Sequence, residues 1–331
     1  MKKGDTFVLE AAPDYVLGFD VGGTRLKAGA VDRKGRLLAQ QIVPTGALAG
    51  PRPLLMSIVG LARSIEKAMG GPASAVGLGL PGAIDPERGI VLLPGRLQGL
   101  EKFPIVPKLR KAFGVPVIAD NDARLAMIAE KEFGLARGKG WALTITIGTG
   151  VGSGVLIDGR ILRDPHLQFG TQASHMVIQA QGGRLCFTGA RGTAEMLCSA
   201  VALAQQVRDG LSRGIPSLLS ARHAADPGSV DFAAVMEGAA RKDRLCVDEL
   251  RVWTQNLGWF LVSAVHAYAP EVVILTGGGA HGARQFLQPL RSHVNRHLFR
   301  WPQGEPLPIV VSKMIDHAGV LGAAAQAWLF A

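Results

Sequence analysis

FDVGGTRLKAGAVD (residues 19–32) and LTITIGTGVGSGVLIDGRI (residues 143–161) are two glycine-rich segments that share one layout. Each runs from an apolar strand through a Gly/Thr turn into a second strand, which leads to a Lys-Gly-Arg turn (residues 34–36) in the first case and an Asp-Gly-Arg turn (residues 158–160) in the second. Both therefore predict a β-hairpin. Because glycine has no Cβ atom, N–H groups and threonine hydroxyls in such turns can closely approach phosphoryl oxygens. Two such turns predict a phosphate clamp that suits the triphosphate of ATP better than a dinucleotide.

Other glycine motifs fit these segments less well. A Walker A loop requires G-x-x-x-x-G-K-[ST] before a helix, and neither segment contains it. Gly148, Gly150 and Gly152 give G-x-G-x-G, but the residues that follow alternate like a strand instead of opening the helix of a dinucleotide fingerprint. A hairpin without a ligand is the alternative for a single glycine turn. The repeated layout, with Asp20 before the first turn and Thr149 in the second, favours phosphate binding.

Composition indicates a soluble globular protein. The chain has 331 residues, of which 48% are hydrophobic and 19% are charged, and this length favours two domains. No run of 18 uncharged apolar residues occurs, and residues 1–16 do not have the pattern of a signal peptide. The three cysteines are too few for a disulfide framework, which agrees with a reducing compartment. We therefore expect a cytoplasmic protein with no membrane partner.

The net charge of +10 raises the question of nucleic-acid binding. Lys and Arg are scattered along the chain, with no basic helix and no zinc-finger spacing. Scattered positive charge more often serves solubility and attracts anionic substrates, of which a nucleotide is one. We expect no nucleic-acid partner.

Strands and helices alternate along the chain. Apolar spacing predicts a helix over residues 53–70, a strand over 76–82, and a strand over 116–120 that leads into a helix closed by Gly134. Residues 194–268 are predicted to be mainly helical. Residues 271–283 predict a strand, a triple-glycine turn and a helix, and residues 319–330 predict a terminal helix. The fold class is therefore α/β.

The motifs DVGGTRLKAGAVD, GLGLPGAID, NDARLAMIAE, TIGTGVGSGVLIDGR and ILTGGGA occur in the order and spacing typical of the ROK family (repressor, open reading frame, kinase). The chain resembles this family from about residue 16 to its end. The resemblance implies an actin-like ATPase (ribonuclease H-like) fold with two α/β domains around a cleft. The smaller N-terminal domain is expected to take residues 1–119 and 318–331, and the larger domain residues 120–317 with a helical insertion.

The resemblance leaves two classes of function open, a sugar kinase and a sugar-sensing transcriptional repressor. Repressors of the family carry a helix-turn-helix domain before the first phosphate motif. About twenty residues precede Asp20, which is too few for a three-helix DNA-reading unit, so we expect the kinase. The resemblance then implies ATP and Mg²⁺ as cofactors, sugar and nucleotide as small-molecule partners, and a homodimer.

Transfer of a phosphoryl group to a hydroxyl requires a base near the acceptor and a cation near the phosphates. Asp122 is the expected general base, because it stands where a strand meets a helix N-terminus; the alternative is that it only caps the helix. In similar kinases the Asn-Asp pair binds the sugar, so Asn121 is expected to hold a sugar hydroxyl. Asp20 is expected near Mg²⁺, through water, although a strand-end Asp can also merely cap its turn.

The phosphate turns and their neighbours supply the remaining candidates. The expected phosphate-facing residues are Gly22, Gly23, Thr24, Gly148, Thr149 and Gly150. The resemblance places the triple glycine (Gly277, Gly278 and Gly279) beside adenosine, with a packing role as the alternative. Gly82 resembles a sugar contact, although a plain turn is nearly as good an explanation. Lys27 could face phosphate or solvent and is left unassigned.

The segment QASHMVIQAQGGRLCFTGARGTAE (residues 172–195) departs from the family pattern. Similar proteins hold a structural zinc with one His and three Cys at this point. Here His175 and Cys186 align with two of these ligands, but Thr188 and Thr193 take the places of two thiolates. Because two remaining ligands cannot complete a four-coordinate site, we expect no structural zinc.

The sugar-contacting positions of similar kinases correspond to His175 and Glu195, which are retained, and to Gln172, which replaces a glutamate. Glutamine carries no charge and has hydrogen-bond donors that an ionised glutamate lacks, so the pocket should contact the sugar differently. We expect transfer of the γ-phosphoryl group of ATP to a hexose hydroxyl, with glucose first and fructose, mannose, allose and N-acetylated hexosamines behind it. A sugar-binding protein with weak or no turnover stays open, although retention of Asp20, Asn121 and Asp122 argues against it.

Overall fold

The structure is a computed structural model that describes residues 14–45, 50–93, 97, 99–164, 172–300 and 304–331. Residues 1–13, on which the expectation of no signal peptide mainly depends, lie outside this described part. Of the helices in the described part of the chain, none has the length and hydropathy of a transmembrane span.

The chain divides into two compact units. Unit 1 comprises Met1–Asp122 and Gly319–Ala331, and unit 2 comprises Ala123–Ala318. Asn121 and Asp122, which the sequence assigns to the second domain, thus fall in unit 1. The physical reason is strand pairing, because the strand that ends at Asn121 pairs with a unit 1 strand up to that residue.

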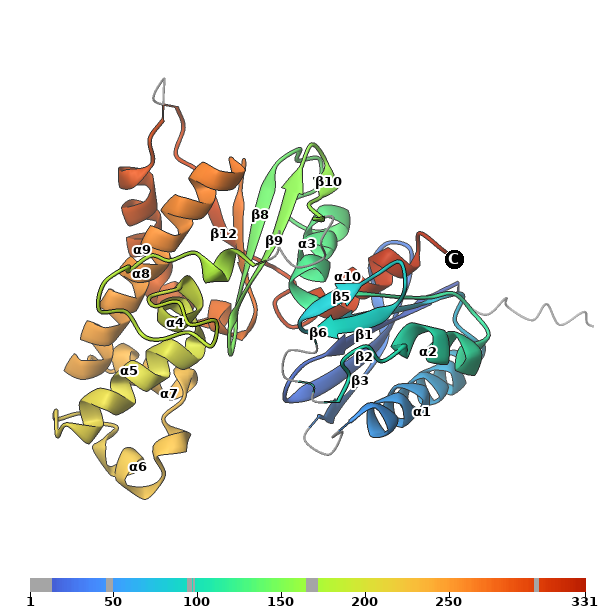
Figure 1. The fold of residues 1–331 in the computed structure, drawn as a ribbon, viewed down its shortest axis with the longest axis horizontal. Coiled ribbons are helices and arrows are strands. Elements are labelled where there is room, and N and C mark those ends of the chain that lie inside the picture. The colour runs from blue at the N-terminus through green and yellow to red at the C-terminus, as the bar shows by residue number, and fades with distance from the viewer. Residues whose placement is uncertain (1–13, 46–49, 94–96, 98, 165–171, 301–303) are drawn as a thin grey trace, which may run out of the picture. The chain divides into compact units, whose positions relative to one another are not determined.

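Unit 1 is built on a five-stranded sheet in the order β3-β2-β1-β4-β7 (Figure 1). Its strands are β1 (Val16–Val21), β2 (Arg25–Val31), β3 (Leu37–Pro44), β4 (Val76–Leu80) and β7 (Val117–Asn121). β1, β2 and β3 run antiparallel, whereas β4 and β7 run parallel to β1. The hairpin predicted over residues 19–32 is therefore confirmed. A separate two-stranded ribbon is formed by β5 (Ala83–Asp85) and β6 (Ile90–Leu93).

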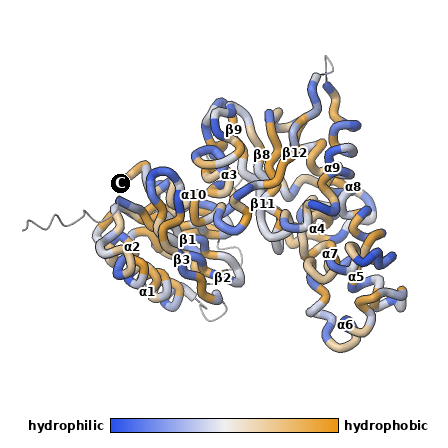
Figure 2. Tube along the Cα trace, turned by 180° about the vertical axis from the view of Figure 1, so that it is seen from behind, coloured by the Kyte–Doolittle hydropathy of each residue, from blue (hydrophilic) through white to orange (hydrophobic). Residues whose placement is uncertain are grey.

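Two helices cover one face of this sheet, α1 (Pro51–Met69) and α2 (Ile105–Phe113), and they contact each other. Figure 2 shows apolar segments on α1 and on the strands beside it. Leu54, Ile58 and Ile65 of α1 pack with the inward side chains of β1, including Phe19. The three- and four-residue spacing that predicts α1 from the sequence is thus the spacing of its buried face.

The opposite face of the unit 1 sheet is covered by α10 (Ala318–Ala327). This helix lies so close that a Cβ atom at Gly18 would be 2.1 Å from the carbonyl oxygen of Val320, and one at Gly77 would be 1.9 Å from that of Ala323. Glycine in these strands therefore permits the helix to touch the sheet backbone. The predicted terminal helix is confirmed, although it ends at Ala327.

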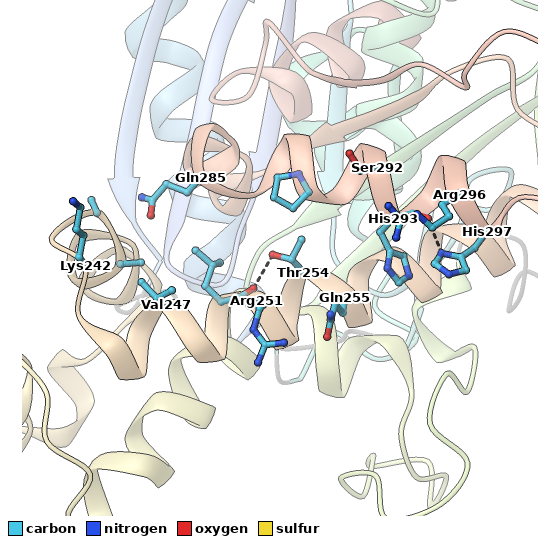
Figure 3. Close-up of a pocket in the computed structure, with 14 residues that line it drawn as sticks. Lys242, Val247, Arg251, Thr254, Gln255, Gln285, Ser292, His293, Arg296 and His297 are labelled. Atoms are coloured by element: carbon cyan, nitrogen blue, oxygen red, sulfur yellow. Dashed lines mark hydrogen bonds between the residues drawn. The ribbon is translucent and has the colours of Figure 1, made fainter.

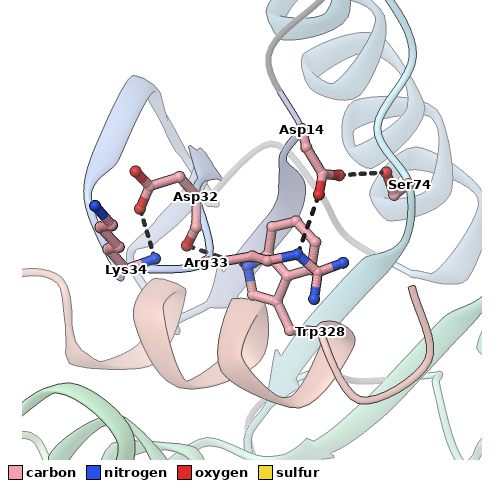
Figure 4. Close-up of polar contacts among 6 residues, drawn as sticks. All are labelled: Asp14, Asp32, Arg33, Lys34, Ser74 and Trp328. Atoms are coloured by element: carbon pink, nitrogen blue, oxygen red, sulfur yellow. Dashed lines mark hydrogen bonds and ion pairs between the residues drawn. The ribbon is translucent and has the colours of Figure 1, made fainter.

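The turn between β2 and β3 is tied to the C-terminal segment of the chain (Figure 4). Asp32 accepts hydrogen bonds from the backbone N–H groups of Lys34 and Arg36, and Trp328 donates its indole N–H to the carbonyl oxygen of Asp32 at 3.1 Å. The guanidinium of Arg33 lies 4.2 Å from the ring centroid of Trp328. These contacts stabilise the end of α10 against the unit 1 sheet.

Unit 2 repeats the sheet of unit 1. Its order is β10-β9-β8-β11-β12, with β8, β9 and β10 antiparallel and with β11 and β12 parallel to β8. The strands are β8 (Ala142–Ile147), β9 (Val151–Ile157), β10 (Arg160–Ile161), β11 (Val273–Thr276) and β12 (Ile309–Val311). The second predicted hairpin is confirmed, and so is the shared layout from which both were predicted.

A helix also packs on glycines of this second sheet. α3 (Asp122–Phe133) follows β7 without a break, as the sequence predicts. A Cβ atom at Gly152 would be 2.7 Å from the Cβ atom of Ala123, and one at Gly154 would be 2.6 Å from that of Met127. α3 therefore stands to the unit 2 sheet as α10 does to the unit 1 sheet.

The predicted helical stretch of unit 2 packs around a large buried core. Trp253 and Phe260 of the longest of its helices are fully buried there with Phe286. The helices are α4 (Ala194–Cys198), α5 (Ala200–Ser212), α6 (Ser220–Ala225), α7 (Phe232–Ala240), α8 (Arg244–Tyr268) and α9 (Ala283–His297), with short 3₁₀ helices at Ala173–His175, Pro227–Ser229 and Gly278–Gly282.

Candidate functional site

Three parallel strands of unit 1 end at one edge of its sheet and bring the predicted residues there. Leu80 of β4 is in register with Asn121 of β7, and Asp20 of β1 is in register with Gly79 of β4. Gly82 follows the end of β4 after Pro81. Side chains that follow parallel strands meet at the carboxyl edge of a sheet, where α/β proteins place their ligand sites.

Asn121 connects the other two residues of unit 1 that are predicted to contact sugar. Its Nδ2 donates to the carbonyl oxygen of Gly82 at 2.9 Å and to Oδ1 of Asp122 at 3.1 Å. Both amide hydrogens of Asn121 are therefore used within unit 1, one on Gly82 and one on Asp122. Asp122 is the first residue of α3, where the helix dipole favours the ionised carboxylate.

Asp20 lies between a lysine and a helix start. Lys27 is its direct cross-strand partner on β2. On the other side, a Cβ atom at Gly319 of α10 would be only 2.5 Å from Cγ of Asp20. Burial raises the pKa of Asp20 above its ordinary value, and the positive charge of Lys27 acts against that rise. Lys27, left unassigned from the sequence, is thus the cation beside Asp20. The register of the hairpin, which pairs positions 20 and 27, is the signal that would have identified it.

Each glycine turn is closed by a hydrogen bond from the N–H of its first glycine. Gly22 donates its N–H to the carbonyl oxygen of Arg25, and Gly148 donates its N–H to that of Gly150, both at 2.9 Å. These first glycines therefore use their N–H groups within the hairpin. Gly23, Thr24 and Thr149 are exposed at the tips, and their N–H groups make no hydrogen bond to a residue that the structure describes.

The triple glycine lies beside the second turn, because β11 and β8 are parallel neighbours. A Cβ atom at Gly277 would be 2.7 Å from the carbonyl oxygen of Ile147, and a Cβ atom at Gly279 would be 2.4 Å from the Cγ2 atom of Ile147. Packing against the end of β8 therefore requires both glycines. Nothing described lies within 4 Å of a Cβ atom at Gly278, which leaves this position open for a ligand.

The three predicted sugar contacts of unit 2 lie in one region. The backbone N–H of His175 donates to the carbonyl oxygen of Gln172 at 3.0 Å, and this short turn contacts α4, which carries Glu195. The carboxylate of Glu195 lies against the second glycine turn: its Oε2 accepts the N–H of Val151 at 3.4 Å, and a Cβ atom at Gly150 would be 2.7 Å from that oxygen. Predicted sugar and phosphate contacts therefore adjoin within unit 2.

The segment that departs from the family pattern brings its four aligned residues together. Sγ of Cys186 is 3.8 Å from Nδ1 of His175. Burial raises the pKa of the Cys186 thiol, but hydrogen bonds from Thr188 and Thr193 outweigh this effect and hold the pKa below its ordinary value. Among the described residues, no group of three or more His, Cys, Asp or Glu side chains could hold a metal ion. The donors at this place are one imidazole, one thiol and two hydroxyls, which do not fit a structural zinc.

The residues of the unit 1 edge fit a nucleotide-bound magnesium ion better. Mg²⁺ is usually held by one or two carboxylates, with water and phosphate oxygens completing its shell. Asp20 supplies one carboxylate next to the exposed tip of the first glycine turn. This donor set suits an ion that arrives with phosphates and does not suit an all-protein metal site.

Comparisons with known proteins agree with this arrangement. The model of the ROK family matches residues 16–328. The glucokinase of Thermotoga maritima is 30% identical over 311 residues, which cover 93% of this chain and 96% of that protein. The crystal structure of a ROK family glucokinase from Streptomyces griseus in complex with glucose and AMPPNP superposes with a TM-score of 0.82, at 26% identity, over 95% of this chain and 99% of that one.

A repressor is also among the relatives. The xylose repressor of Caldicellulosiruptor bescii is 27% identical over 266 residues, which cover 80% of this chain and 65% of that protein. The similarity to both kinds of protein confirms the α/β fold of the actin-like ATPases expected from the sequence. The roles of individual site residues remain predictions.

Proposed function

This chain belongs to the ROK family, and from that premise we propose that it is an ATP-dependent sugar kinase with Asp122 as its general base. The observation that carries the proposal is the unit 1 edge, where Gly82, Asn121 and Asp122 are joined by hydrogen bonds and Asp20 lies one residue before the end of β1. The glucokinase relatives support a hexose as the acceptor, with glucose first.

In this proposal Asn121 fixes the base. Its amide donates to Oδ1 of Asp122 and so orients the carboxylate that accepts the proton of the attacking sugar hydroxyl. The carbonyl oxygen of Asn121 accepts a second sugar hydroxyl. Since a base must lie within about 3 Å of the hydroxyl oxygen whose proton it takes, this orientation matters as much as the carboxylate itself.

The glycine turns and Asp20 serve the nucleotide. Backbone N–H groups at the tips of the two turns would bind the phosphates of ATP, and Gly278 would leave room beside adenosine. Magnesium, when bound with ATP, neutralises charge that develops on the transferred phosphoryl group. Burial raises the pKa of Asp20, and Lys27 opposes that rise and so favours the ionised carboxylate that this role requires.

Measurement of ADP release with a panel of hexoses tests the proposal. Asp122→Asn should lower kcat by about two to four orders of magnitude, the usual scale of general base catalysis, with sugar binding less affected. Asp158→Asn is the matched control, because Asp158 is exposed at the β9–β10 turn and asparagine tolerates its positive φ of 49°. A kcat within threefold of wild type for Asp122→Asn would remove this residue from the mechanism.

A sugar-binding protein without turnover is the second candidate, because Gln172, Thr188 and Thr193 all depart from the family pattern. Thermal stabilisation by a hexose without ADP release from ATP would favour it. A third candidate, a regulator like the xylose repressor, would instead bind DNA in a sugar-dependent way.

A further inference from the structure

Unit 2 contains a groove between α8 and α9 that none of the proposed nucleotide or sugar residues lines. Its volume is about 610 Å³, within the range of roughly 300–1,000 Å³ that is typical of small-molecule sites. Figure 3 shows the polar side chains along it, from Lys242 at the α7 end to His297 at the other.

The groove is cationic along its whole length. Lys242 lies at one end, Arg251 lies between, and Arg296 lies at the far end (Figure 3). No aspartate or glutamate lines the groove among the residues described. The side chains of these three cations make no hydrogen bond or ion pair with any other described residue. Cations gathered in a concave surface whose lining contains no acid attract an anion.

Aromatic rings pack against one another at one end of the groove. The ring centroids of His293 and His297 are 4.5 Å apart, and Trp259 of α8 packs against both. A Cβ atom at Gly258 would be 2.4 Å from Cδ2 of His293, so this ring rests on the backbone of α8. Burial lowers the pKa of His293, and the charges of His297 and Arg296 lower it further. Glycine inside a helix costs about 1 kcal/mol of stability relative to alanine. The presence of Gly258 in α8 therefore indicates that its packing with His293 is specific.

Polar groups suited to hydroxyls line the rest of the groove. Gln255, Gln285 and Ser292 supply amides and a hydroxyl. Pro289, inside α9, has no N–H, so the carbonyl oxygen of Gln285 four residues earlier loses its helical donor. An acceptor of this kind suits a ligand that has hydroxyl groups as well as negative charge.

We propose that the groove between α8 and α9 binds a sugar phosphate, separately from the kinase site. Phosphate groups would lie at the cationic ends, and the sugar hydroxyls would lie between them against Gln255 and Gln285. A second copy of the chain fits less well, because two such faces would bring like charges together without an acid to pair them.

Calorimetric titration with fructose 1,6-bisphosphate tests this site. AMPPNP and glucose are present in excess throughout, so that the proposed kinase site is filled. Arg251→Gln/Arg296→Gln is compared with Arg52→Gln/Arg137→Gln, which removes the same charge from exposed arginines elsewhere. The first pair should weaken binding by about tenfold or more, since each charge-assisted hydrogen bond contributes on the order of tenfold. The control pair should bind like wild type.

Arg251→Lys/Arg296→Lys keeps the charge and should retain most of the binding, and thermal melting checks that each variant is folded. Three results would overturn the proposal. The first is that wild type gives no heat of binding with millimolar fructose 1,6-bisphosphate. The second is that Arg251→Gln/Arg296→Gln binds as tightly as wild type. The third is that the control pair loses as much affinity as Arg251→Gln/Arg296→Gln. None of these readouts depends on turnover.

Discussion

Gly319→Ala tests how the unit 1 edge positions Asp20. The added Cβ atom would lie 2.5 Å from Cγ of Asp20 and 2.7 Å from its Oδ2, whereas ordinary contacts of a Cβ atom begin at 3.4 Å. The carboxylate must therefore move by about 1 Å, or α10 must leave the sheet by as much. Gly319 does not have a positive φ, so alanine is compatible with the backbone itself.

The expected effect is larger on turnover than on stability. A displacement of about 1 Å in a group that positions reactants costs on the order of 100-fold in rate, so kcat should fall by about that factor. Overpacking of this kind costs about 1–3 kcal/mol in the free energy of unfolding. Sugar affinity should stay near that of wild type, because the three atoms nearest the added Cβ all belong to Asp20 and not to the proposed sugar contacts.

ADP release gives kcat, calorimetry gives sugar affinity, and thermal melting gives stability. Gly60→Ala is the matched control: it also replaces a helical glycine, but a Cβ atom at Gly60 has nothing described within 4 Å, so kcat should not change. A folded Gly319→Ala protein with kcat within threefold of wild type would refute the claim that this glycine holds Asp20 in place.

Three further predictions address specificity, metal binding and pH. Gln172→Glu should change the relative kcat/KM values of the hexose panel by about tenfold or more, because it replaces amide donors with a charge; an unchanged order would exclude Gln172 from the sugar site. Thr188→Cys/Thr193→Cys should bind one zinc ion per chain, measured by atomic absorption, because both positions adjoin Cys186 and His175; a metal-free double variant would contradict this. Asp243→Ala should cost about 1–2 kcal/mol at neutral pH. Burial raises the pKa of Asp243, but hydrogen bonds from N–H groups, including that of Cys246 at the start of α8, outweigh this effect and lower the pKa. The stability cost of Asp243→Ala, measured by urea titration, should therefore shrink as the pH falls below about 4.

The elements predicted correctly are those whose pattern is local. The two hairpins, α1 and the β7–α3 junction each carry apolar spacing and turn residues within a short stretch. β3 and α2 are missed for the opposite reason. β3 is an edge strand with half-exposed side chains and no clear alternation, and α2 is short and has a proline in its first turn.

The candidate site is predictable in its residue types more than in its contacts. Asn121 and Asp122 can be chosen from the sequence because they adjoin in it. The hydrogen bond from Asn121 to Gly82 depends on the pairing of β4 with β7. The contact of Gly319 with Asp20 joins positions about 300 residues apart in the sequence. No local pattern encodes such contacts, which only the packing of α10 on the sheet creates.

The repeated sheet also explains where the two acids of the proposed chemistry stand. The last strand of each sheet leads into the helix that packs on the other sheet: β7 of unit 1 leads into α3 of unit 2, and β12 of unit 2 leads into α10 of unit 1. The chain therefore passes from one unit to the other at Asp122 and again at Gly319. Asp122, the proposed base, is the last residue before the first passage, and Gly319, the first residue after the second, touches Asp20. The exchange of helices therefore ties both Asp122, the proposed base, and Asp20, the proposed magnesium ligand, to the connections between the units.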